Sequence, residues 1–438
     1  MLRIYWGIHS LFVFIESLIL IKKSESMSDA EIKDLQYKKL KKIINYAWKY
    51  VPFYKQYWGQ HGFSPEHFNC IADISLIPFI DKTTVRTFSD EFLSRKYSKK
   101  ILTKSYSGGT TGVPTAFYLN KYFTKPREIA YSLYYYWKYY KYYRGIQKVA
   151  IIRGFRIDEQ LVQRKIFWFK NKREPGLFFS SFHISEENYY YYILKLKEYS
   201  PSYIKAYPSS IVALCLLMER HGDYGIPGLK AVICSSETIY DWHRSLIKKM
   251  LGVEIYSFYG HSEKLCCAYQ NKDEMIFPPF YGYVEFQKCD DNLFEIVATT
   301  YEHNAFPLIR YRTSDIVEMN ASHVRKILGR KQDFVYDKNG DIRIFTCEEE
   351  LFFGIDGIMA YQYVQNQMGL LELHIETNNE FSESSLTIIQ KRGKECFDNI
   401  DINIELVSSI PRTSSGKFRY LIQNIQEKEM LVRKYKNP

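Results

Sequence analysis

Residues 105–115 read Ser-Tyr-Ser-Gly-Gly-Thr-Thr-Gly-Val-Pro-Thr, with three glycines and five Ser or Thr residues in eleven positions. Glycines let the backbone approach an anion closely, and hydroxyl and free backbone N–H groups hydrogen-bond to its oxygens. No Gly-Lys-Ser/Thr follows at the spacing that P-loop NTPases require. Taken alone, the stretch is either a phosphate-binding loop of another kind or an ordinary surface loop.

The length and composition indicate a globular protein of more than one domain. A chain of 438 residues exceeds one compact core, so we expect two or three domains. The net charge of +11 is mild for this length and suits an anionic ligand or an anionic surface equally well. The eight cysteines include no Cys-x-x-Cys pair, which is typical of reduced thiols in a cytoplasmic protein. We expect Cys266 and Cys267 to be packed in the core, because adjacent cysteines lack metal-ligand spacing.

Residues 1–23 predict an amphipathic helix. His9, Glu16 and Lys23 recur every seven residues and form a polar stripe. Glu16 interrupts the apolar run, so we do not expect a spanning helix, and no small-residue cleavage site follows. We expect the helix to pack on the body of the protein; the alternative is peripheral contact with a membrane surface. One helical face carries Leu11, Phe12, Ile15, Leu18 and Ile19.

Two further helices are indicated. Residues 28–31 form a capping-box pattern that opens a helix with an apolar face, ending near Val51 and Pro52. Residues 131–144 interleave aromatic residues with Lys and Arg, which is compatible with single-stranded nucleic acid binding or with a helix that buries its tyrosines. No RNA-recognition signature accompanies the run, so we expect a helix and no nucleic-acid partner.

The middle of the chain alternates short buried strands with helices. Strands are predicted at 149–154, 230–234 and 253–258, with helices at 211–219 and 241–251. This alternation predicts an α/β fold with a parallel sheet, in which ligands bind beyond the carboxyl ends of the strands. The stretches 235–237 and 259–263 follow such strands.

The pattern changes after residue 280. Residues 280–327 alternate with period two, which predicts an antiparallel sheet or a small barrel. Residues 325–332 read as a linker. Lys-Asn-Gly-Asp at 338–341 is a strong hairpin signal, and residues 333–438 predict a small α+β domain. The expected fold is therefore a large N-terminal domain of parallel α/β sheets with a small β-barrel-like antiparallel part, followed by a small α+β C-terminal domain.

Five motifs in one order resemble the adenylate-forming (acyl-CoA synthetase) superfamily. The likeness is strongest to its phenylacetate–coenzyme A ligase and capsule-biosynthesis CapK branch. Each motif is weak alone, but together, in order over residues 105–417, they are highly specific. Segments 281–285 and 307–312 also resemble the CapK branch. The motifs are Ser-Gly-Gly-Thr-Thr-Gly-Val-Pro at 107–114, Tyr-Gly-His-Ser-Glu at 259–263, Tyr-Arg-Thr-Ser-Asp at 311–315, Gly-Arg-Lys-Gln-Asp at 329–333 and Pro-Arg-Thr-Ser-Ser-Gly-Lys at 411–417.

The resemblance implies an adenylation core at 1–328 that holds ATP and the acyl substrate, a hinge at 329–332, and a mobile lid domain at 333–438 that carries Lys417. The lid turns between the two half-reactions. The implied nucleotide-binding residues are Ser107, Gly108, Gly109, Thr110, Thr111, Gly112, Ser236, Glu237, Tyr259, Gly260 and Asp315.

The chemistry of these residue types fits the implied roles. The flat ring of Tyr259 can stack on adenine, and core packing is its alternative. The carboxylate of Asp315 can accept two hydrogen bonds from ribose hydroxyls, and a turn-forming role is its alternative. Glu263 is a hard oxygen ligand suited to Mg²⁺, or else a solvated surface carboxylate.

The implied catalytic residues are Lys417, Ser262 and Arg330. Lys417 would place a point cation where negative charge gathers as a carboxylate attacks the α-phosphate. Ser262 would donate to that phosphate, and Arg330 would contact the ribose or the adenylate.

The chain departs from the family pattern at four positions. Thr115 replaces a lysine that many relatives carry, Ser236 and Ser314 stand where glycine is usual, and Gln332 takes the place of the hinge aspartate. The nucleotide half of the implied site is intact, whereas the acceptor half is left open.

The implied activity is ATP- and Mg²⁺-dependent activation of a carboxylic acid as an acyl-adenylate. Transfer then goes to coenzyme A or to an amine or hydroxyl of a sugar or carrier. The alternative is a catalytically silent scaffold of a polysaccharide-assembly complex, against which the retained Glu263, Asp315, Arg330 and Lys417 argue. Residues 203–210 and 235–238 are expected to line the acyl pocket without selecting one acid.

Overall fold

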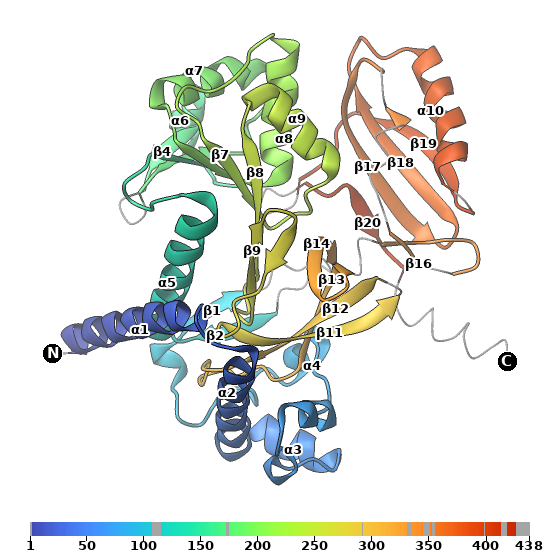
Figure 1. Cartoon of the computed structure of the whole chain (residues 1–438). Helices are drawn as coiled ribbons and strands as arrows, with labels where there is room; N and C mark the ends of the chain where they lie inside the picture. The colour runs from blue at the N-terminus through green and yellow to red at the C-terminus, as the bar shows by residue number, and fades with distance from the viewer. Residues whose placement is uncertain are drawn as a thin grey trace. The chain divides into compact units, whose positions relative to one another are not determined.

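The computed structural model describes residues 2–106, 115–171, 175–290, 292–330, 334–340, 342–344, 351–352, 355–397, 399–412 and 418–425. The chain forms two units, and each joins two stretches that are distant in sequence. The first unit comprises 1–147 and 256–327, and the second comprises 148–255 and 328–438. The predicted fold class is confirmed: a parallel α/β sheet, antiparallel sheets and a small C-terminal domain (Figure 1).

A parallel sheet forms the core of the second unit. Every residue of strand β7 (Ala231–Ser235) is buried, as expected for a parallel strand that is covered on both faces. The parallel strands are β3 (Val149–Arg153), β5 (Leu177–Ser180), β6 (Tyr203–Ala206) and β7 (Ala231–Ser235), and β4 (Trp168–Lys170) pairs antiparallel with β5. The helices are α6 (Glu159–Gln163), η4 (Glu186–Asn188), α7 (Tyr189–Tyr199), α8 (Pro208–Arg220) and α9 (Asp241–Leu251).

The predicted strands and helices of this region are confirmed, with one shift. The strand expected at 253–258 is β8 (Glu254–Gly260), so Tyr259 and Gly260 end a strand and do not belong to the loop after it. The end of β8 pairs antiparallel with β9 (Cys267–Asn271), which forms a hairpin with β10 (Glu274–Ile276). Cys266 and Cys267 are buried, as predicted.

An antiparallel meander follows: β11 (Gly282–Asp290), β12 (Leu293–Thr300), β13 (Tyr311–Asn320) and β14 (His323–Arg330). The predicted period-two segment is therefore confirmed. The linker expected at 325–332 is wrong for 325–330, which lie in β14. The charged residues Arg325 and Lys326 resemble a linker, but an edge strand tolerates such charges, and Val324 anchors this one in the core.

The N-terminal part of the first unit is helical. The capping box at Ser28 and Glu31 is confirmed, with the Ser28 N–H donating to the Glu31 carboxylate at 2.8 Å. The predicted apolar face of α2 is buried. In α5 the tyrosines at 131, 135, 136 and 140 are buried, which confirms the helical interpretation of that run. The elements are α1 (Leu2–Ser24), α2 (Asp29–Tyr50), α3 (Pro52–Gln60), η1 (Pro65–His67), η2 (Ile71–Leu76), α4 (Lys82–Thr87), η3 (Lys99–Ile101), β1 (Thr103–Tyr106), β2 (Ala116–Leu119) and α5 (Lys121–Tyr140).

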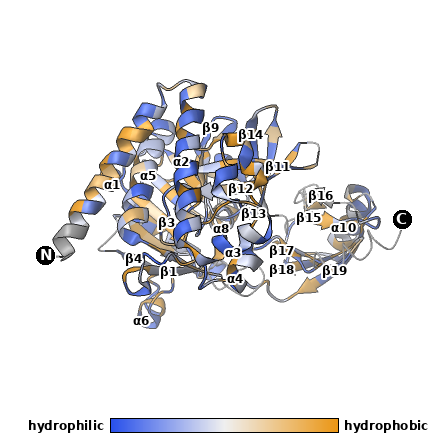
Figure 2. Cartoon of the chain, turned by 90° about the horizontal axis from the view of Figure 1, so that it is seen from below, coloured by the Kyte–Doolittle hydropathy of each residue, from blue (hydrophilic) through white to orange (hydrophobic). Residues whose placement is uncertain are grey.

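Helix α1 packs along α5, but not through the predicted face (Figure 2). Leu11, Phe12, Ile15 and Ile19 are exposed, and the buried face consists of Val13, Ser17 and Ile21. The expectation was wrong because apolar residues occur on all sides of α1, so periodicity could not select the buried stripe. None of the helices in the described part of the chain has the length and apolarity needed to cross a membrane.

Among its described residues, the C-terminal domain contains a four-stranded sheet in the order β19-β18-β17-β20 and the helix α10. The predicted hairpin at 338–341 is confirmed: β15 and β16 pair antiparallel on either side of it. Tyr420 packs against Tyr240 and Trp242 at the start of α9, within the second unit. The elements are β15 (Phe334–Tyr336), β16 (Ile342–Ile344), β17 (Ile358–Gln367), β18 (Leu370–Thr377), α10 (Glu383–Cys396), β19 (Asp401–Val407) and β20 (Leu421–Gln423).

Candidate active site

Tyr259 and Asp315 meet in the first unit. The Tyr259 hydroxyl donates to the Oδ2 atom of Asp315 at 2.6 Å. Burial, together with the nearby Asp315 carboxylate, raises the pKa of Tyr259 well above its usual range, so its hydroxyl remains a donor. Asp315 is 8 % exposed. A short hydrogen bond to a carboxylate is of the strong, charge-assisted kind and fixes the direction of the second carboxylate oxygen.

The backbone before Asp315 is held in an unusual conformation. Ser314 has a φ of +63°, a left-handed value that favours glycine. Its N–H donates to the buried carboxylate of Glu295 at 3.2 Å, and the same carboxylate pairs with Arg312. The Asp315 N–H donates to the hydroxyl of Thr313 at 3.1 Å. These contacts fix the turn within β13 that presents Asp315 to Tyr259.

Glu263 is buried beside an imidazole. The carboxylate of Glu263, a residue only 8 % exposed, lies 3.2 Å from Nδ1 of His261. The Nε2 atom of the same ring lies 3.4 Å from the sulfur of Cys266. Glu263 is therefore not the solvated surface carboxylate that was its alternative. A buried carboxylate oriented by a histidine is suited to hold a hard cation as one ligand among several.

The second unit contains a second polar cluster, after β7. Ser236 has a φ of +73°, again left-handed. Glu237 accepts from the N–H of Ser209 at 2.9 Å and from its hydroxyl at 3.0 Å, at the start of α8. A carboxylate in this position is stabilised by the free N–H groups and the dipole of the helix N-terminus. On the same sheet edge, Arg153 donates to the Ser235 hydroxyl at 2.8 Å.

Two residues that flank Lys417 contact this cluster. The N–H of Phe418 donates to Glu237 at 3.2 Å, and Arg412 donates to the Ser209 hydroxyl at 3.4 Å. Burial lowers the pKa of Arg412, yet a guanidinium stays charged at neutral pH. Arg412 thus contacts the start of α8, and Phe418 contacts the loop after β7.

The other predicted residues are placed as follows. Gly260 ends β8, and Ser262 lies in the partly exposed loop after it. Arg330 is the last residue of β14, and its side chain is outside the described part. Ser107, Gly108, Gly109, Thr110, Thr111, Gly112 and Lys417 lie outside the described residues.

Two family-like segments are joined by an ion pair. Arg310 donates to Glu285 through Nε at 3.1 Å and Nη2 at 3.0 Å. It also donates to the backbone carbonyls of Ser75 and Ile77 at 2.8 and 2.7 Å. Burial raises the pKa of Glu285, with Arg310 opposing the shift. Segments 281–285 and 307–312 therefore serve the architecture of the first unit, because they tie its helical part to the meander.

Sequence reasoning missed several residues of these clusters. His261, Ser209, Glu295 and Arg412 hold the predicted carboxylates or their backbone. His261 and Arg412 stand inside quoted motifs, so their place in the motif was the available signal. Ser209 and Glu295 carry no local signal, because they meet their partners only in the folded chain.

Several known proteins are similar to this chain over most of its length. The CapK C-terminal domain family matches residues 337–424. Protein CapK of Staphylococcus aureus is 26% identical over 410 residues, which cover 90% of this chain and 89% of that protein. Phenylacetate-coenzyme A ligase of Escherichia coli (strain K12) is 23% identical over 444 residues, covering 90% and 95%. The crystal structure of 2-hydroxyisobutyryl-CoA ligase in the postadenylation state has the same fold, with a TM-score of 0.69, 17% identity and 94% of both chains covered.

The motifs, the fold and these relatives together define the class of protein: the chain is an adenylate-forming ligase. Its likeness to the CapK C-terminal domain and to CapK over most of its length gives the finer assignment. Its likeness is thus to the phenylacetate–coenzyme A ligase-like CapK branch of the superfamily.

Proposed function

We propose that the protein activates a carboxylic acid with ATP and Mg²⁺. A carboxylate oxygen attacks the α-phosphorus, the bond to the β-phosphate oxygen breaks, and pyrophosphate leaves with the electron pair. The acyl-adenylate is then attacked at its carbonyl carbon by the thiol of coenzyme A, or by an amine or hydroxyl of a sugar or carrier, and AMP leaves. A cytoplasmic location, where ATP is available, fits this proposal.

The observation that carries the proposal is the Tyr259–Asp315 pair. An ionised carboxylate has several acceptor sites on its two oxygens, so Asp315 can accept from Tyr259 and also from ribose hydroxyls. The flat Tyr259 ring can stack on adenine. Both residues stand in motifs that resemble those of the superfamily, which supports a nucleotide as the ligand.

The donor set at Glu263 fits Mg²⁺. Mg²⁺ is usually held by one or two carboxylates, phosphate oxygens and water, and does not need a cage of protein ligands. Glu263 supplies one buried hard oxygen, and His261 orients it. When bound, the cation would neutralise charge on the phosphates. The role of Glu263 is to hold it, and that of Ser262 is to donate to the α-phosphate.

Lys417 is proposed to supply the positive charge for the adenylation step. The contacts of Arg412 and Phe418 with Ser209 and Glu237 support this role, because these two residues stand on either side of Lys417 in the sequence. The loss of one such charge-stabilising donor costs about 3–4 kcal/mol in the transition state, or 10²–10³ in rate.

A pyrophosphate-release assay over a panel of aliphatic, hydroxylated and aromatic acids tests the first step, with the adenylates identified by mass spectrometry. One acid should give pyrophosphate and its adenylate, and EDTA should abolish both. Lys417→Ala should lose about 10²–10³ in rate. Lys434→Ala, in the same basic C-terminal segment, is the control. If no acid provokes release and Lys417→Ala behaves like the parent, the enzyme proposal fails.

The acceptor and the scaffold alternative require separate measurements. Purified acyl-adenylate mixed with coenzyme A, amino sugars or neutral sugars should give one transfer product. Calorimetry with ATP distinguishes the silent scaffold, which would show no nucleotide binding in the presence of Mg²⁺.

We also propose that residues 333–438 act as a lid that turns about 329–332. The postadenylation, open and thioesterification states in which 2-hydroxyisobutyryl-CoA ligase was solved support a moving domain in this superfamily. Gln332→Pro would stiffen the hinge by fixing φ. The variant should leave the rate of pyrophosphate release unchanged and slow the transfer of the acyl group. If both rates fall equally, the proposed hinge motion is contradicted.

Helix α1 is proposed to rest on an anionic membrane surface. Its outward face carries five large apolar side chains with helical spacing, and the helix ends in the exposed Lys22 and Lys23. Phe12 and Ile19 are 60 % and 63 % exposed. An apolar stripe next to cations is typical of helices that lie in the interface of an anionic bilayer. The stripe consists of Ile8, Leu11, Phe12, Ile15 and Ile19.

Vesicle co-sedimentation tests this contact. Vesicles containing phosphatidylserine should retain the protein more strongly than neutral vesicles, and Phe12→Glu should release it. Tyr224→Glu, at an exposed position of the second unit, is the control. Self-association that Phe12→Glu abolishes, without vesicle binding, would show that the stripe binds a second copy and would refute the membrane contact.

A further inference from the structure

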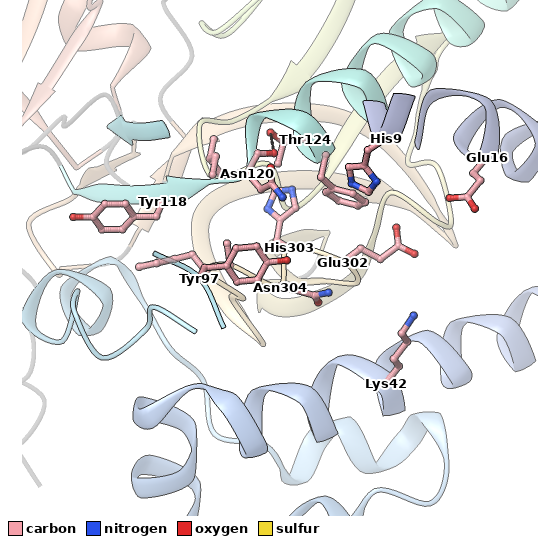
Figure 3. A pocket seen from close by; sticks show the side chains of 14 residues that line it. His9, Glu16, Lys42, Tyr97, Tyr118, Asn120, Thr124, Glu302, His303 and Asn304 are labelled. Atoms are coloured by element: carbon pink, nitrogen blue, oxygen red, sulfur yellow. Dashed lines mark hydrogen bonds between the residues drawn. The ribbon is translucent and has the colours of Figure 1, made fainter. Parts of the chain in front are cut away.

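A polar pocket in the first unit is not used by the proposed chemistry. It has a volume of about 240 Å³ and lies between α1, α2, the start of α5 and the turn between β12 and β13 (Figure 3). At about 30 Å³ per water molecule, this volume corresponds to roughly eight waters, more than a structural water site needs. The pocket is large enough for a small ring-shaped ligand.

The pocket contains a buried polar side chain without a hydrogen-bond partner. His303 is 6 % exposed and lines the cavity. Within the described part of the chain, its imidazole makes no hydrogen bond, and its ring lies in a T-shaped arrangement with Phe123, at a centroid distance of 6.2 Å. Burial, with the nearby charge of Arg127, lowers the pKa of His303 to about 3. The ring is therefore neutral at pH 7 and offers one donor and one acceptor.

Charged side chains of both signs lie around His303, and the buried guanidinium of Arg127 is one of the positive groups. Glu302 forms an ion pair with Lys39 at 2.7 Å. Glu16 from α1 and Lys42 from α2 also line the pocket (Figure 3). The two lining carboxylates, Glu16 and Glu302, are matched in number by Lys42 and Lys39, so these four side chains do not by themselves select a cation or an anion.

Amide and aromatic groups complete the lining. Asn304 contributes a carboxamide, which in the described structure makes no hydrogen bond, so it adds two donors and an acceptor. Tyr97, Phe123 and Phe306 supply flat apolar surface. Hydrogen-bond donors and acceptors next to aromatic faces are complementary to a ring that has hydroxyls on its rim and C–H groups on its face.

We propose that this pocket binds a neutral polyhydroxylated compound of monosaccharide size. His303 and Asn304 exchange hydrogen bonds with its hydroxyls, and Phe123 and Phe306 cover its C–H face. Because α1 forms one wall through His9 and Glu16, a bound ligand also fixes α1 on the body of the unit. The site goes beyond the proposed ligase activity, since its occupation requires neither ATP nor the acid.

Saturation-transfer NMR with the full-length protein, without ATP, tests the proposal. The probes are methyl glucoside and N-acetylglucosamine as neutral sugars, glucosamine as a cation and glucuronate as an anion. The neutral sugars should receive saturation and compete with each other. The proposal is overturned if none of the four sugars gives a signal, or if glucosamine or glucuronate binds more tightly than the neutral sugars.

Two variants connect the signal to the pocket. Asn304→Ala and His303→Gln should each weaken binding about tenfold, the typical effect of losing a buried hydrogen bond to a ligand. Asn292→Ala, in the exposed turn between β11 and β12, is the matched control and should bind like the parent. Asn304 is only partly buried, so its variant keeps the test valid if His303→Gln does not fold. Unchanged affinity in Asn304→Ala would refute the assignment.

Discussion

Tyr259→Phe removes one hydroxyl from the first unit and leaves the aromatic ring in place. In the parent, that hydroxyl donates to Asp315 at 2.6 Å, and Asp315 is 8 % exposed. A hydrogen bond to a charged group contributes about 1.5–3 kcal/mol to stability, and the carboxylate left behind is too buried to recover it from water. We therefore expect the free energy of unfolding to fall by about 1.5–3 kcal/mol.

The same substitution separates the two proposed roles of Tyr259. Phenylalanine still stacks on adenine, so a loss of ATP affinity in Tyr259→Phe would come from the misdirected Asp315 carboxylate. Tyr259→Ala removes both effects. A larger loss of ATP affinity in Tyr259→Ala than in Tyr259→Phe would measure the stacking.

Urea denaturation and ATP calorimetry are the assays. Tyr256→Phe is the matched control, because it lies on the same strand and its ring stacks on Tyr140, while its hydroxyl makes no hydrogen bond among the described residues. A double-mutant cycle with Asp315→Asn should give a coupling energy within about 0.5–3 kcal/mol. If Tyr259→Phe is as stable as Tyr256→Phe and the coupling energy is near zero, the proposed stabilisation by the Tyr259–Asp315 hydrogen bond is refuted.

Three further predictions concern the fold. Arg310→Met should destabilise the first unit by about 3–5 kcal/mol in urea denaturation, because Glu285 is left buried and unpaired, and Arg310→Met with Glu285→Leu should recover much of the loss. Gly282→Ala should lower the unfolding temperature, because its added Cβ would lie 1.9 Å from a neighbouring backbone oxygen. Gly59→Ala in α3 is the control: its Cβ would meet nothing within 4 Å, so its unfolding temperature should equal or exceed that of the parent. Burial lowers the pKa of His243 to about 3, so stability present above pH 6.5 is lost as the pH falls. Between pH 7 and 5.5 this residue should account for about 1 kcal/mol, which His243→Gln would remove from the pH dependence of urea denaturation.

The sequence predicted the elements whose pattern is strong and local. The capping box at Ser28 specifies where α2 begins, because its partners are three residues apart. The buried strand β7 and the hairpin at 338–341 were equally clear, since a short apolar run and an Asn-Gly turn act within a few residues.

The sequence did not predict which face of α1 is buried or that β14 continues to Arg330. In both cases the local pattern allowed two solutions, and the neighbouring elements selected one. Ser236 and Ser314 illustrate the same limit. Their departure from glycine was visible in the sequence, but the left-handed φ that explains the usual glycine is visible only in the structure.

The sequence by itself determined the class of protein. Five motifs in a fixed order carry the residue types that nucleotide chemistry requires, and the motifs can be recognised without knowing where their residues lie in space. The tertiary structure decided which of those residues contact one another. Asp315 meets Tyr259 across 56 positions, and Glu237 is held by Ser209 and by the backbone at Phe418, across 181 positions. The pocket around His303 likewise draws its walls from both ends of the first unit. Contacts between such distant residues leave no local pattern in the sequence. They form only when the burial of apolar surface throughout a unit brings its helices and strands together.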